Sequence, residues 1–495
     1  MIIAHDLGTT GDKASLHHDD GRPVASATET YPTRYADGGV AEQDPDDWWR
    51  AVGAATRALL ARTGTAAAEV TAVGFSGQMM GAVVLDAAHR PVRPALIWAD
   101  HRSTAQADRL RGAVGAERAY RILGHRLDPT YTLAKLLWLR DEEPDAYART
   151  AHVCLAKDYV VHRLTGTLVT DPSDASSTNA YDQREGAWSA EVLAAAGVDP
   201  GLFPEIVPST TVAGTVTPAA AEATGLAPGT KVVVGGGDGP LAALGAGIVE
   251  PGDGAYTYLG SSSWISMSAD RPLHDPLART MTFDHVVPGR YVPTATMQAG
   301  GAALDWIAEL LRPGEAGRFD RLVAAADGAD TGGLYFLPHL MGERSPYWNP
   351  RARGAFVGLA RHHGPAHLTK AVLEGVAFNL AGCLDAFAEA GREVRRVDAI
   401  GGGATSDVWL RVLADVWGVP VRRRGIVEGA NSLGAAVTAA VGAGLVDGFA
   451  VARGLSETTA EFEPDPARHA RYAERHRAFQ DAYRRLEPFY EEGAR

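Results

Sequence analysis

The start of the chain alternates apolar and polar residues in the pattern of a β-hairpin. Ile2 to Ala4 form a short apolar run, residues 6–11 are polar or small, and residues 13–17 alternate before a returning run at 23–27. Residues 46–62 instead space their apolar side chains along one face of a helix. The first half is also expected to contain strands at 70–75, 83–85 and 95–98, and helices at 104–114 and 133–139. Hairpins mixed with helices indicate an α/β or α+β domain rather than a regular βαβ array.

A strand–turn–strand pattern like the first one returns half a chain later. Leu7-Gly8-Thr9-Thr10 and Leu259-Gly260-Ser261-Ser262 each lie between two expected strands. From residue 231 onward the pattern predicts strands at 231–234, 255–259, 264–267, 397–400 and 419–421, and helices at 240–247, 304–311, 368–387, 407–417 and 466–487. The repeat predicts a duplicated unit, with residues 1–247 in one domain and 248–495 in the other.

Composition narrows the class of protein. The chain has 495 residues, 46% of them hydrophobic and 22% charged, with a formal net charge of −13, which argues against a general nucleic-acid binder. Cys154 and Cys383 are too few and too far apart for a zinc site or a disulfide framework. The N-terminus lacks a basic segment, and the uncharged run 429–446 contains polar residues and glycines, so it predicts a buried helix. We therefore expect a cytoplasmic protein with neither a membrane nor a nucleic-acid partner.

Three turns of small residues follow expected strands directly, at Asp6–Thr10, Gly260–Ser263 and Gly401–Thr405. Such turns let backbone N–H groups converge on an anion, because no Cβ atom blocks a close approach. A carboxylate beside the first turn suits a Mg²⁺ ion held between Asp6 and a phosphate. Each turn taken alone is explained as well by a tight connection. Three together with two carboxylates favour a phosphate site.

Asp238 is the second carboxylate, and glycines on both sides leave it open to approach. At a strand end it can accept the proton of an attacking hydroxyl, as phosphoryl transfer requires. It can equally cap a helix that begins near Pro240, and its position alone does not separate these roles.

Trp98 and the polar groups around it, Gln78, Asp100, His101 and Arg102, can line a cleft of the size of a sugar. Neither a G-x-x-x-x-G-K-[ST] motif, nor G-x-G-x-x-G after a strand, nor His-Glu-x-x-His is present.

A series of motifs in register resembles the FGGY carbohydrate kinases, and within them the xylulose kinases. The residues that carry the resemblance span nearly the whole chain: Asp6-Leu7-Gly8-Thr9-Thr10 with Lys13, Glu42-Gln43-Asp44-Pro45 with Trp48-Trp49, Ser76-Gly77-Gln78-Met79-Met80-Gly81, Thr132 through Lys135 to Trp138, Lys157-Asp158-Tyr159, Ser173-Asp174-Ala175-Ser176, Gly235 to Gly239, Gly342-Glu343-Arg344-Ser345-Pro346, Gly354 to Leu359 with Glu374, and Gly401-Gly402-Gly403-Ala404.

The resemblance implies an α/β protein with the actin-like ATPase (ribonuclease H-like) fold, in which two similar domains surround a central cleft. It implies ATP and Mg²⁺ as cofactors, phosphorylation of a primary hydroxyl of a ketopentose such as D-xylulose, and a homodimer as the assembly common among similar kinases. The site residues that it implies are Asp238 as general base; Asp6 and Asp238 at the metal; Thr9, Thr10, Lys13, Gly260 and Ser261 at the phosphates; Gly402 and Gly403 at the adenosine; and Gln78, Met79, Met80, Asp100 and Asp238 at the sugar.

Departures from the xylulose kinase pattern leave the substrate open. Met80 stands where those enzymes typically have histidine, and Gly239 stands where an asparagine is usual. Loss of a polar side chain that binds a sugar hydroxyl shifts substrate choice. The Arg-Glu pair of glycerol kinases is also missing at Met79-Met80, which counts against glycerol. Two alternatives therefore stand beside D-xylulose: a kinase for another ketose or polyol, and a nucleotide-gated sugar-binding protein without catalysis.

Overall fold

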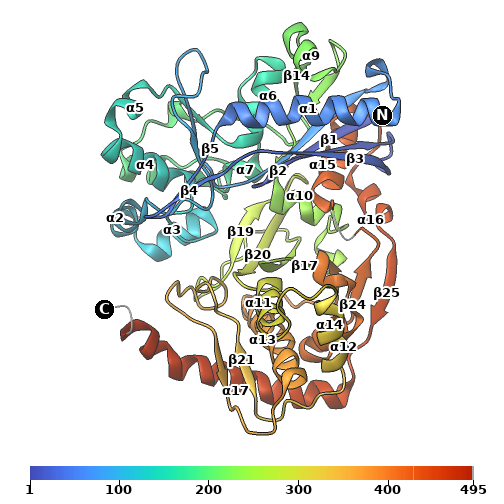
Figure 1. Ribbon diagram of the computed structural model, residues 1–495. Coiled ribbons are helices and arrows are strands. Elements are labelled where there is room, and N and C mark those ends of the chain that lie inside the picture. Colours follow the sequence, from blue (N-terminus) through green and yellow to red (C-terminus); the bar gives the residue numbers. More distant parts are fainter. Residues whose placement is uncertain (427–428, 493–495) are drawn as a thin grey trace.

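The computed structural model describes residues 1–426 and 429–492, which form two lobes, each built around a seven-stranded sheet (Figure 1). The first sheet has the order β14-β15-β6-β1-β2-β3, with β16 also paired to β6. Its strands are β1 (Ile2–Leu7), β2 (Gly11–His17), β3 (Pro23–Thr30), β6 (Ala72–Gly77), β14 (Val212–Thr215), β15 (Lys231–Val233) and β16 (Gly236–Gly237). The expected hairpin is present, because β1 and β2 pair antiparallel while β1 and β6 pair parallel.

The second sheet repeats this arrangement and has the order β19-β20-β18-β17-β23-β24-β25. Its strands are β17 (Ala255–Leu259), β18 (Ser263–Met267), β19 (Met281–Asp284), β20 (Tyr291–Met297), β23 (Val397–Ile400), β24 (Val421–Arg424) and β25 (Thr458–Phe462). Strand β17 pairs antiparallel with β18 and parallel with β23, just as β1 pairs with β2 and β6 in the first sheet. Strands β24 and β25 pair antiparallel at the edge of the second sheet. The predicted duplication into two similar domains is therefore confirmed.

Helix α1 (Pro45–Thr63) shows how local sequence sets an element that covers the first sheet. The Asp44 side chain accepts a hydrogen bond from the Asp46 N–H, Pro45 occupies the first helical position, and Gly64 ends the helix with φ of 67°. The buried face includes Trp48, and it packs on β2 and β3. Helix α15 (Ala430–Ala443), from the second half of the chain, packs on β1 and β6. Along the chain the first sheet ends with β16 and the second begins with β17, while α15 crosses back to the first sheet.

Helix α10 (Asp238–Gly245) lies between the two lobes. Leu241 and Leu244 join a core cluster with β1 and α15, while Ala242 and Ala243 pack with residues of the second sheet. The helix therefore contacts both sheets. Its first residue, Asp238, is placed at the junction of the two domains.

Helix α13 (Pro365–Glu389) is the core helix of the second domain and contributes many of its buried side chains. Among the described residues it alone is long and apolar enough to cross a membrane, yet 83% of its most apolar window is buried inside the protein. The shorter uncharged run at 429–446 forms α15, which is also buried, as its sequence predicted.

The structure shifts some predicted boundaries. Helix α10 begins at Asp238 rather than at Pro240, and β24 covers 421–424 rather than 419–421. The apolar run at 95–98 forms only the short strand β8 (Ala95–Leu96), because Trp98 turns to donate a hydrogen bond to Thr9. These differences arise from long-range contacts that hydrophobic periodicity does not report.

His17, His125 and His285 are buried, and burial lowers the pKa of each to about 4. Because a histidine in the unfolded chain has a pKa near 6.5, the unfolded state binds more protons between these values. We expect the free energy of unfolding to fall as the pH is lowered from 6.5 to 4, by up to about 1.4 kcal/mol per pH unit for each histidine. Urea unfolding at a series of pH values measures this slope. His17→Gln should flatten it, and an unchanged slope in that variant would contradict the assignment.

Candidate active site

Three neighbouring strands of the first sheet end together and form one wall of the site. The parallel register pairs Asp6 of β1 with Ser76 of β6, and Ser76 with Gly236 of β16. The carboxyl ends of parallel strands meet at one edge of a sheet, where ligands bind in open α/β folds. Three segments that are far apart in the sequence therefore lie side by side: residues 6–10, which are predicted to bind phosphate (the phosphate turn), residues 76–81, which are predicted to contact the sugar (the sugar-contacting turn), and the glycine run before Asp238.

Asp6 is half-buried at this edge and is held by two neighbours. Ser76 Oγ donates to Asp6 Oδ1 at 2.9 Å, and Asn431 Nδ2 from α15 donates to the same oxygen at 3.3 Å. Burial raises the pKa of Asp6, while these hydrogen bonds and the Lys13 ammonium oppose the rise. Lys13 is the cross-strand partner of Asp6 in β2. Asp6 Oδ2 accepts no hydrogen bond from the described residues, which leaves it available to a ligand.

Asp238 is half-buried at the first turn of α10. Its Oδ1 accepts the N–H of Gly239 at 2.8 Å, and the N-cap position belongs to Gly237. The interpretation of Asp238 as the cap of the helix is therefore wrong in its simple form, because Asp238 is itself the first helical residue. Burial, and after it the nearby charge of Asp6, together raise its pKa to about 7. The two carboxylates are thus electrostatically coupled.

The donor set fits a magnesium ion bound together with phosphate. Mg²⁺ takes one or two carboxylates and fills its other positions with phosphate oxygens and water. Asp6 and Asp238 supply two carboxylates that disfavour each other's charge, and a cation between them would relieve that repulsion. Among the described residues no group of three or more His, Cys, Asp or Glu side chains could hold a metal ion by itself.

The phosphate turn between β1 and β2 is supported from outside the hairpin. Gly8 N–H donates to the Gly11 carbonyl at 3.1 Å, and the Thr9 carbonyl accepts from Gln43 Nε2 at 2.6 Å. Thr9 Oγ1 accepts from Trp98 Nε1 at 2.9 Å, whereas Thr10 is exposed. The backbone N–H groups of Thr9 and Thr10 have no partner among the residues that the structure describes. They are therefore free to bind an anion.

The second domain presents its own turns at the ends of β17 and β23, which pair parallel. Gly260 has no room for a Cβ atom, which would lie 2.2 Å from the Tyr258 ring, and Ser261 beside it is exposed. A Cβ on Gly403 would lie 2.6 Å from Trp409, so this glycine is required by packing. Gly402 is exposed with open space around it. This open side suits the close approach of a flat ligand.

The predicted sugar-contacting turn follows β6. Met79 is buried and packs against Gly237 and Gly239, on either side of Asp238. Met80 is half-buried and has φ of 66°, so its backbone adopts the left-handed conformation. Gln78 is buried and donates to Gln43 Oε1 at 2.8 Å, which connects this turn to the phosphate turn.

Asp100 differs from the other predicted sugar residues because no part of it is exposed. Its carboxylate accepts hydrogen bonds from the Ala41 N–H at 2.9 Å and from the Arg102 guanidinium at 2.7 Å. The structure therefore does not bring Asp100 to the surface of the cleft. Its contact with a sugar stays a prediction.

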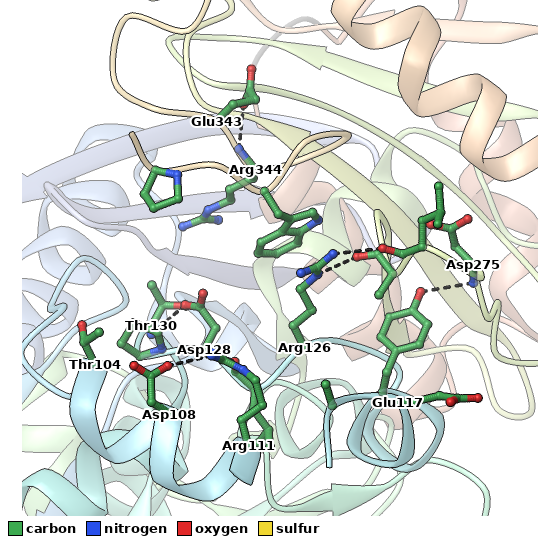
Figure 2. Close-up of a pocket in the computed structure, with 18 of the residues that line it drawn as sticks. Thr104, Asp108, Arg111, Glu117, Arg126, Asp128, Thr130, Asp275, Glu343 and Arg344 are labelled. Atoms are coloured by element: carbon green, nitrogen blue, oxygen red, sulfur yellow. Dashed lines mark hydrogen bonds and ion pairs between the residues drawn. The ribbon is translucent and has the colours of Figure 1, made fainter. Parts of the chain in front are cut away.

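A pocket of about 1090 Å³ opens between the two halves of the chain, and Lys135 links it to the sugar-contacting turn. Figure 2 shows Glu343 and Arg344 on one side of it, and Asp128 and Thr130 on the other. Lys135 connects the pocket to the sugar-contacting turn, because its ammonium donates to the carbonyls of Thr130 and Met80. None of the predicted sugar residues Gln78, Met79, Met80, Asp100 and Asp238 is among the described residues that line the pocket, so its use by a sugar stays a prediction.

Sequence reasoning missed several residues that hold the site. Ser76 and Asn431 bind Asp6, and the Tyr256 hydroxyl donates to the Gly239 carbonyl at 3.3 Å. Trp264 Nε1 in turn donates to Tyr256 Oη at 2.8 Å. The polar Asn431 at the start of an apolar run was the one available signal, since a half-buried amide among apolar residues favours a hydrogen-bond partner. Nothing local indicates that residue 431 meets residue 6.

Comparison with known proteins identifies the family of this chain. The N-terminal domain model of the FGGY family of carbohydrate kinases matches residues 1–245, and its C-terminal domain model matches residues 255–443. The chain is 35% identical to the xylulose kinase of Escherichia coli K12 over 99% of both chains. It is 30% identical to the gluconokinase of Bacillus licheniformis over 94% of this chain and 91% of the relative. The crystal structure of xylulose kinase from Rhodospirillum rubrum superposes with a TM-score of 0.92, at 32% identity over 99% of both chains.

These matches extend through both domains and include the turns that form the site. The fold is the actin-like ATPase fold with two domains, as the sequence predicted. The chain belongs to the FGGY family of carbohydrate kinases.

Proposed function

We propose that this kinase transfers a phosphoryl group from ATP to the primary hydroxyl of D-xylulose, giving D-xylulose 5-phosphate. The observation that carries the proposal is the placement of Asp238. It lies at the junction of the two domains, next to Met79, and the nearby charge of Asp6 raises its pKa. Several curated relatives along nearly the full length are xylulose kinases, which supports the choice of sugar.

Asp238 acts as the general base in this proposal. Its carboxylate accepts the proton of the sugar hydroxyl as that oxygen attacks phosphorus. The Gly239 N–H fixes Asp238 Oδ1, so the second oxygen is the one that faces the hydroxyl. Bound ATP with Mg²⁺ supplies the phosphoryl group and the positive charge that stabilises it in transit. Asp6, Asp238 and Lys13 would hold that assembly, with Thr9, Thr10, Gly260 and Ser261 at its phosphates.

The proposed assignment is tested by measuring ATP consumption with Mg²⁺ across a panel of ketoses, aldoses, polyols and sugar acids, with product mass recorded. We expect D-xylulose to give the highest kcat/KM and a monophosphate product. A higher kcat/KM for another compound would keep the kinase and replace the substrate. The proposal further places the enzyme in the cytoplasm as a homodimer, and light scattering measures the assembly.

A second candidate substrate class is another ketose, a polyol or a sugar acid. Met80 favours it, because a thioether replaces the imidazole typical of xylulose kinases. The similarity to a gluconokinase at 30% identity supports the same alternative. The substrate panel separates the two candidates directly.

Met80→His tests whether this position selects the substrate. Histidine tolerates the left-handed backbone of residue 80, so the turn should keep its shape. One added hydrogen bond to a sugar hydroxyl is expected to raise kcat/KM for D-xylulose relative to the rest of the panel by about tenfold. Met80→Leu is the matched control and should leave the ranking unchanged. An equal shift in both variants would show that size, not hydrogen bonding, sets the choice.

A further inference from the structure

A short buried segment behind the site contacts both functional turns of the first domain. It comprises helix α7 (Pro172–Ala175) and the turn that follows, and we call residues 171–178 the serine segment. Ser173, Ser176 and Ser177 are each at most 1% exposed. The proposed mechanism assigns none of these side chains a part.

Each serine hydroxyl donates its proton within the segment. Ser173 Oγ donates to Asp171 Oδ2 at 2.5 Å, and Ser176 Oγ and Ser177 Oγ donate to the carbonyls of Ser173 and Asp174, both at 2.8 Å. A hydroxyl has one proton and two lone pairs. With the proton directed inward, each oxygen is oriented to accept a hydrogen bond from outside.

The three outside donors belong to three different parts of the molecule. Gly237 N–H, directly before Asp238, donates to Ser173 Oγ at 2.9 Å. Met80 N–H, in the sugar-contacting turn, donates to Ser177 Oγ at 3.2 Å. The third donor, the N–H of Asp284 in β19 of the second domain, reaches Ser176 Oγ at 3.0 Å. One segment therefore binds the backbone beside the proposed base, the sugar-contacting turn and the other domain.

The serine segment is itself anchored by a buried cation. Lys157 Nζ lies 2.6 Å from Asp158 Oδ1, 3.0 Å from Asp171 Oδ1 and 3.1 Å from Asp174 Oδ2, and none of the four side chains is exposed. Ser209 Oγ also donates to Asp171 Oδ2, at 2.7 Å. Asp171 thus has both oxygens fixed, and it fixes the hydroxyl of Ser173 in turn.

The serine segment and the lysine that anchors it are tightly packed against the ends of two strands. A Cβ on Gly236 would lie 2.6 Å from Ser173 Oγ, and a Cβ on Gly77 would lie 2.9 Å from the Lys157 Cβ. The absence of side chains lets Gly236 rest directly on the serine segment and Gly77 rest on Lys157, which anchors that segment. A displacement of the segment would be transmitted to both strand ends.

We propose that the serine segment positions the two reacting halves of the active site relative to each other, with Ser173 orienting the turn of the general base and Ser177 orienting the sugar-contacting turn. These serines are positioning residues, since none touches the substrate. The inference rests on the proposed role of Asp238 and of the Met79-Met80 turn. It predicts that the two serines affect different kinetic constants.

The test compares Ser173→Ala, Ser177→Ala and Thr178→Val, using whichever sugar the wild-type enzyme phosphorylates best. Ser173→Ala should lower kcat about tenfold with little change in KM for the sugar, because the base loses its alignment. Ser177→Ala should instead raise KM for the sugar severalfold with a smaller change in kcat. Thr178→Val is the matched control. The Thr178 hydroxyl is buried in the same segment, but it accepts only from the nearby Ala180 N–H, so kcat and KM should not change.

Thermal unfolding of all three variants separates positioning from general destabilisation. If the serine variants and Thr178→Val show the same kinetic losses at matched loss of stability, the inference is overturned. Should Ser173→Ala not fold, Ser209→Ala can be used instead, because it removes a hydrogen bond to Asp171 Oδ2, the oxygen that holds the Ser173 hydroxyl. Ser209→Ala is expected to lower kcat by a smaller factor. An unchanged kcat in a folded Ser209→Ala variant would then contradict the proposed positioning role of Ser173. Retained turnover in Asp238→Ala would contradict the proposed base itself, which is a distinct result.

Discussion

Replacing Asp238 with alanine is expected to lower kcat by about 10² to 10⁴-fold while the protein stays folded. A positioned general base contributes a factor of this size. The side chain accepts the N–H of the adjacent Gly239 and does not cap α10, so little native structure depends on it. Because burial raises its pKa to about 7, the ionised carboxylate is disfavoured by the fold at neutral pH. Its removal should therefore leave the melting temperature unchanged or raise it.

The measurement is kcat for sugar phosphorylation together with thermal unfolding of the same preparation. Asp44→Ala is the matched control, because Asp44 is an exposed aspartate that does cap a helix, by accepting the Asp46 N–H at 2.9 Å. That variant should lose about 1 kcal/mol of stability and keep its kcat. If Asp238→Ala instead behaves like Asp44→Ala, Asp238 has a structural role and the proposed mechanism is wrong.

Lys157→Met is expected to destabilise the fold by about 3–5 kcal/mol, the largest effect on stability that the structure predicts. The variant leaves the carboxyl groups of Asp158, Asp171 and Asp174 buried without their cation. Burial already raises the pKa of Asp158 and Asp174, and the Lys157 ammonium opposes that rise. Without it the carboxyl groups must either remain charged in an apolar environment or bind protons at neutral pH. Chemical unfolding at pH 7 measures the loss.

The dependence on pH distinguishes this mechanism from loss of packing. In the variant the folded protein holds carboxyl groups whose pKa lies above that of the unfolded chain, so folding takes up protons. The deficit relative to the wild type is fully present above the folded pKa and should shrink as the pH is lowered from 7 towards 5. Lys135→Met is the control, since Lys135 is also fully buried but donates to carbonyls. Lys135→Met should lose less stability than Lys157→Met, and its loss should not depend on the ionisation of buried carboxyl groups. An equal loss of stability in the two variants would contradict the explanation by unpaired carboxyl groups.

The repeat, the turns and the carboxylates of this kinase are readable from the sequence. Alternation at the N-terminus predicts β1 and β2, small residues after apolar runs predict the turns at Thr9 and Gly260, and Asp6 and Asp238 stand out by their neighbours. These features depend on residues close together in the chain. Periodicity and turn chemistry are local properties, so they are visible without a fold.

What the tertiary structure alone decides is how these segments meet. Asn431 donates to Asp6 because α15 crosses to the first sheet, and Ser173 accepts from Gly237 because α7 packs against β16. Asp100 stands beside Trp98 in the sequence but is enclosed by its pairing with Arg102. The amino-acid sequence by itself determined which groups this protein has for phosphoryl transfer and in which turns they lie. Which serines, amides and cations hold those groups, and how burial shifts their charge, depends on contacts between residues that are far apart in the sequence, as Asn431 is from Asp6, and these contacts exist only in the folded chain.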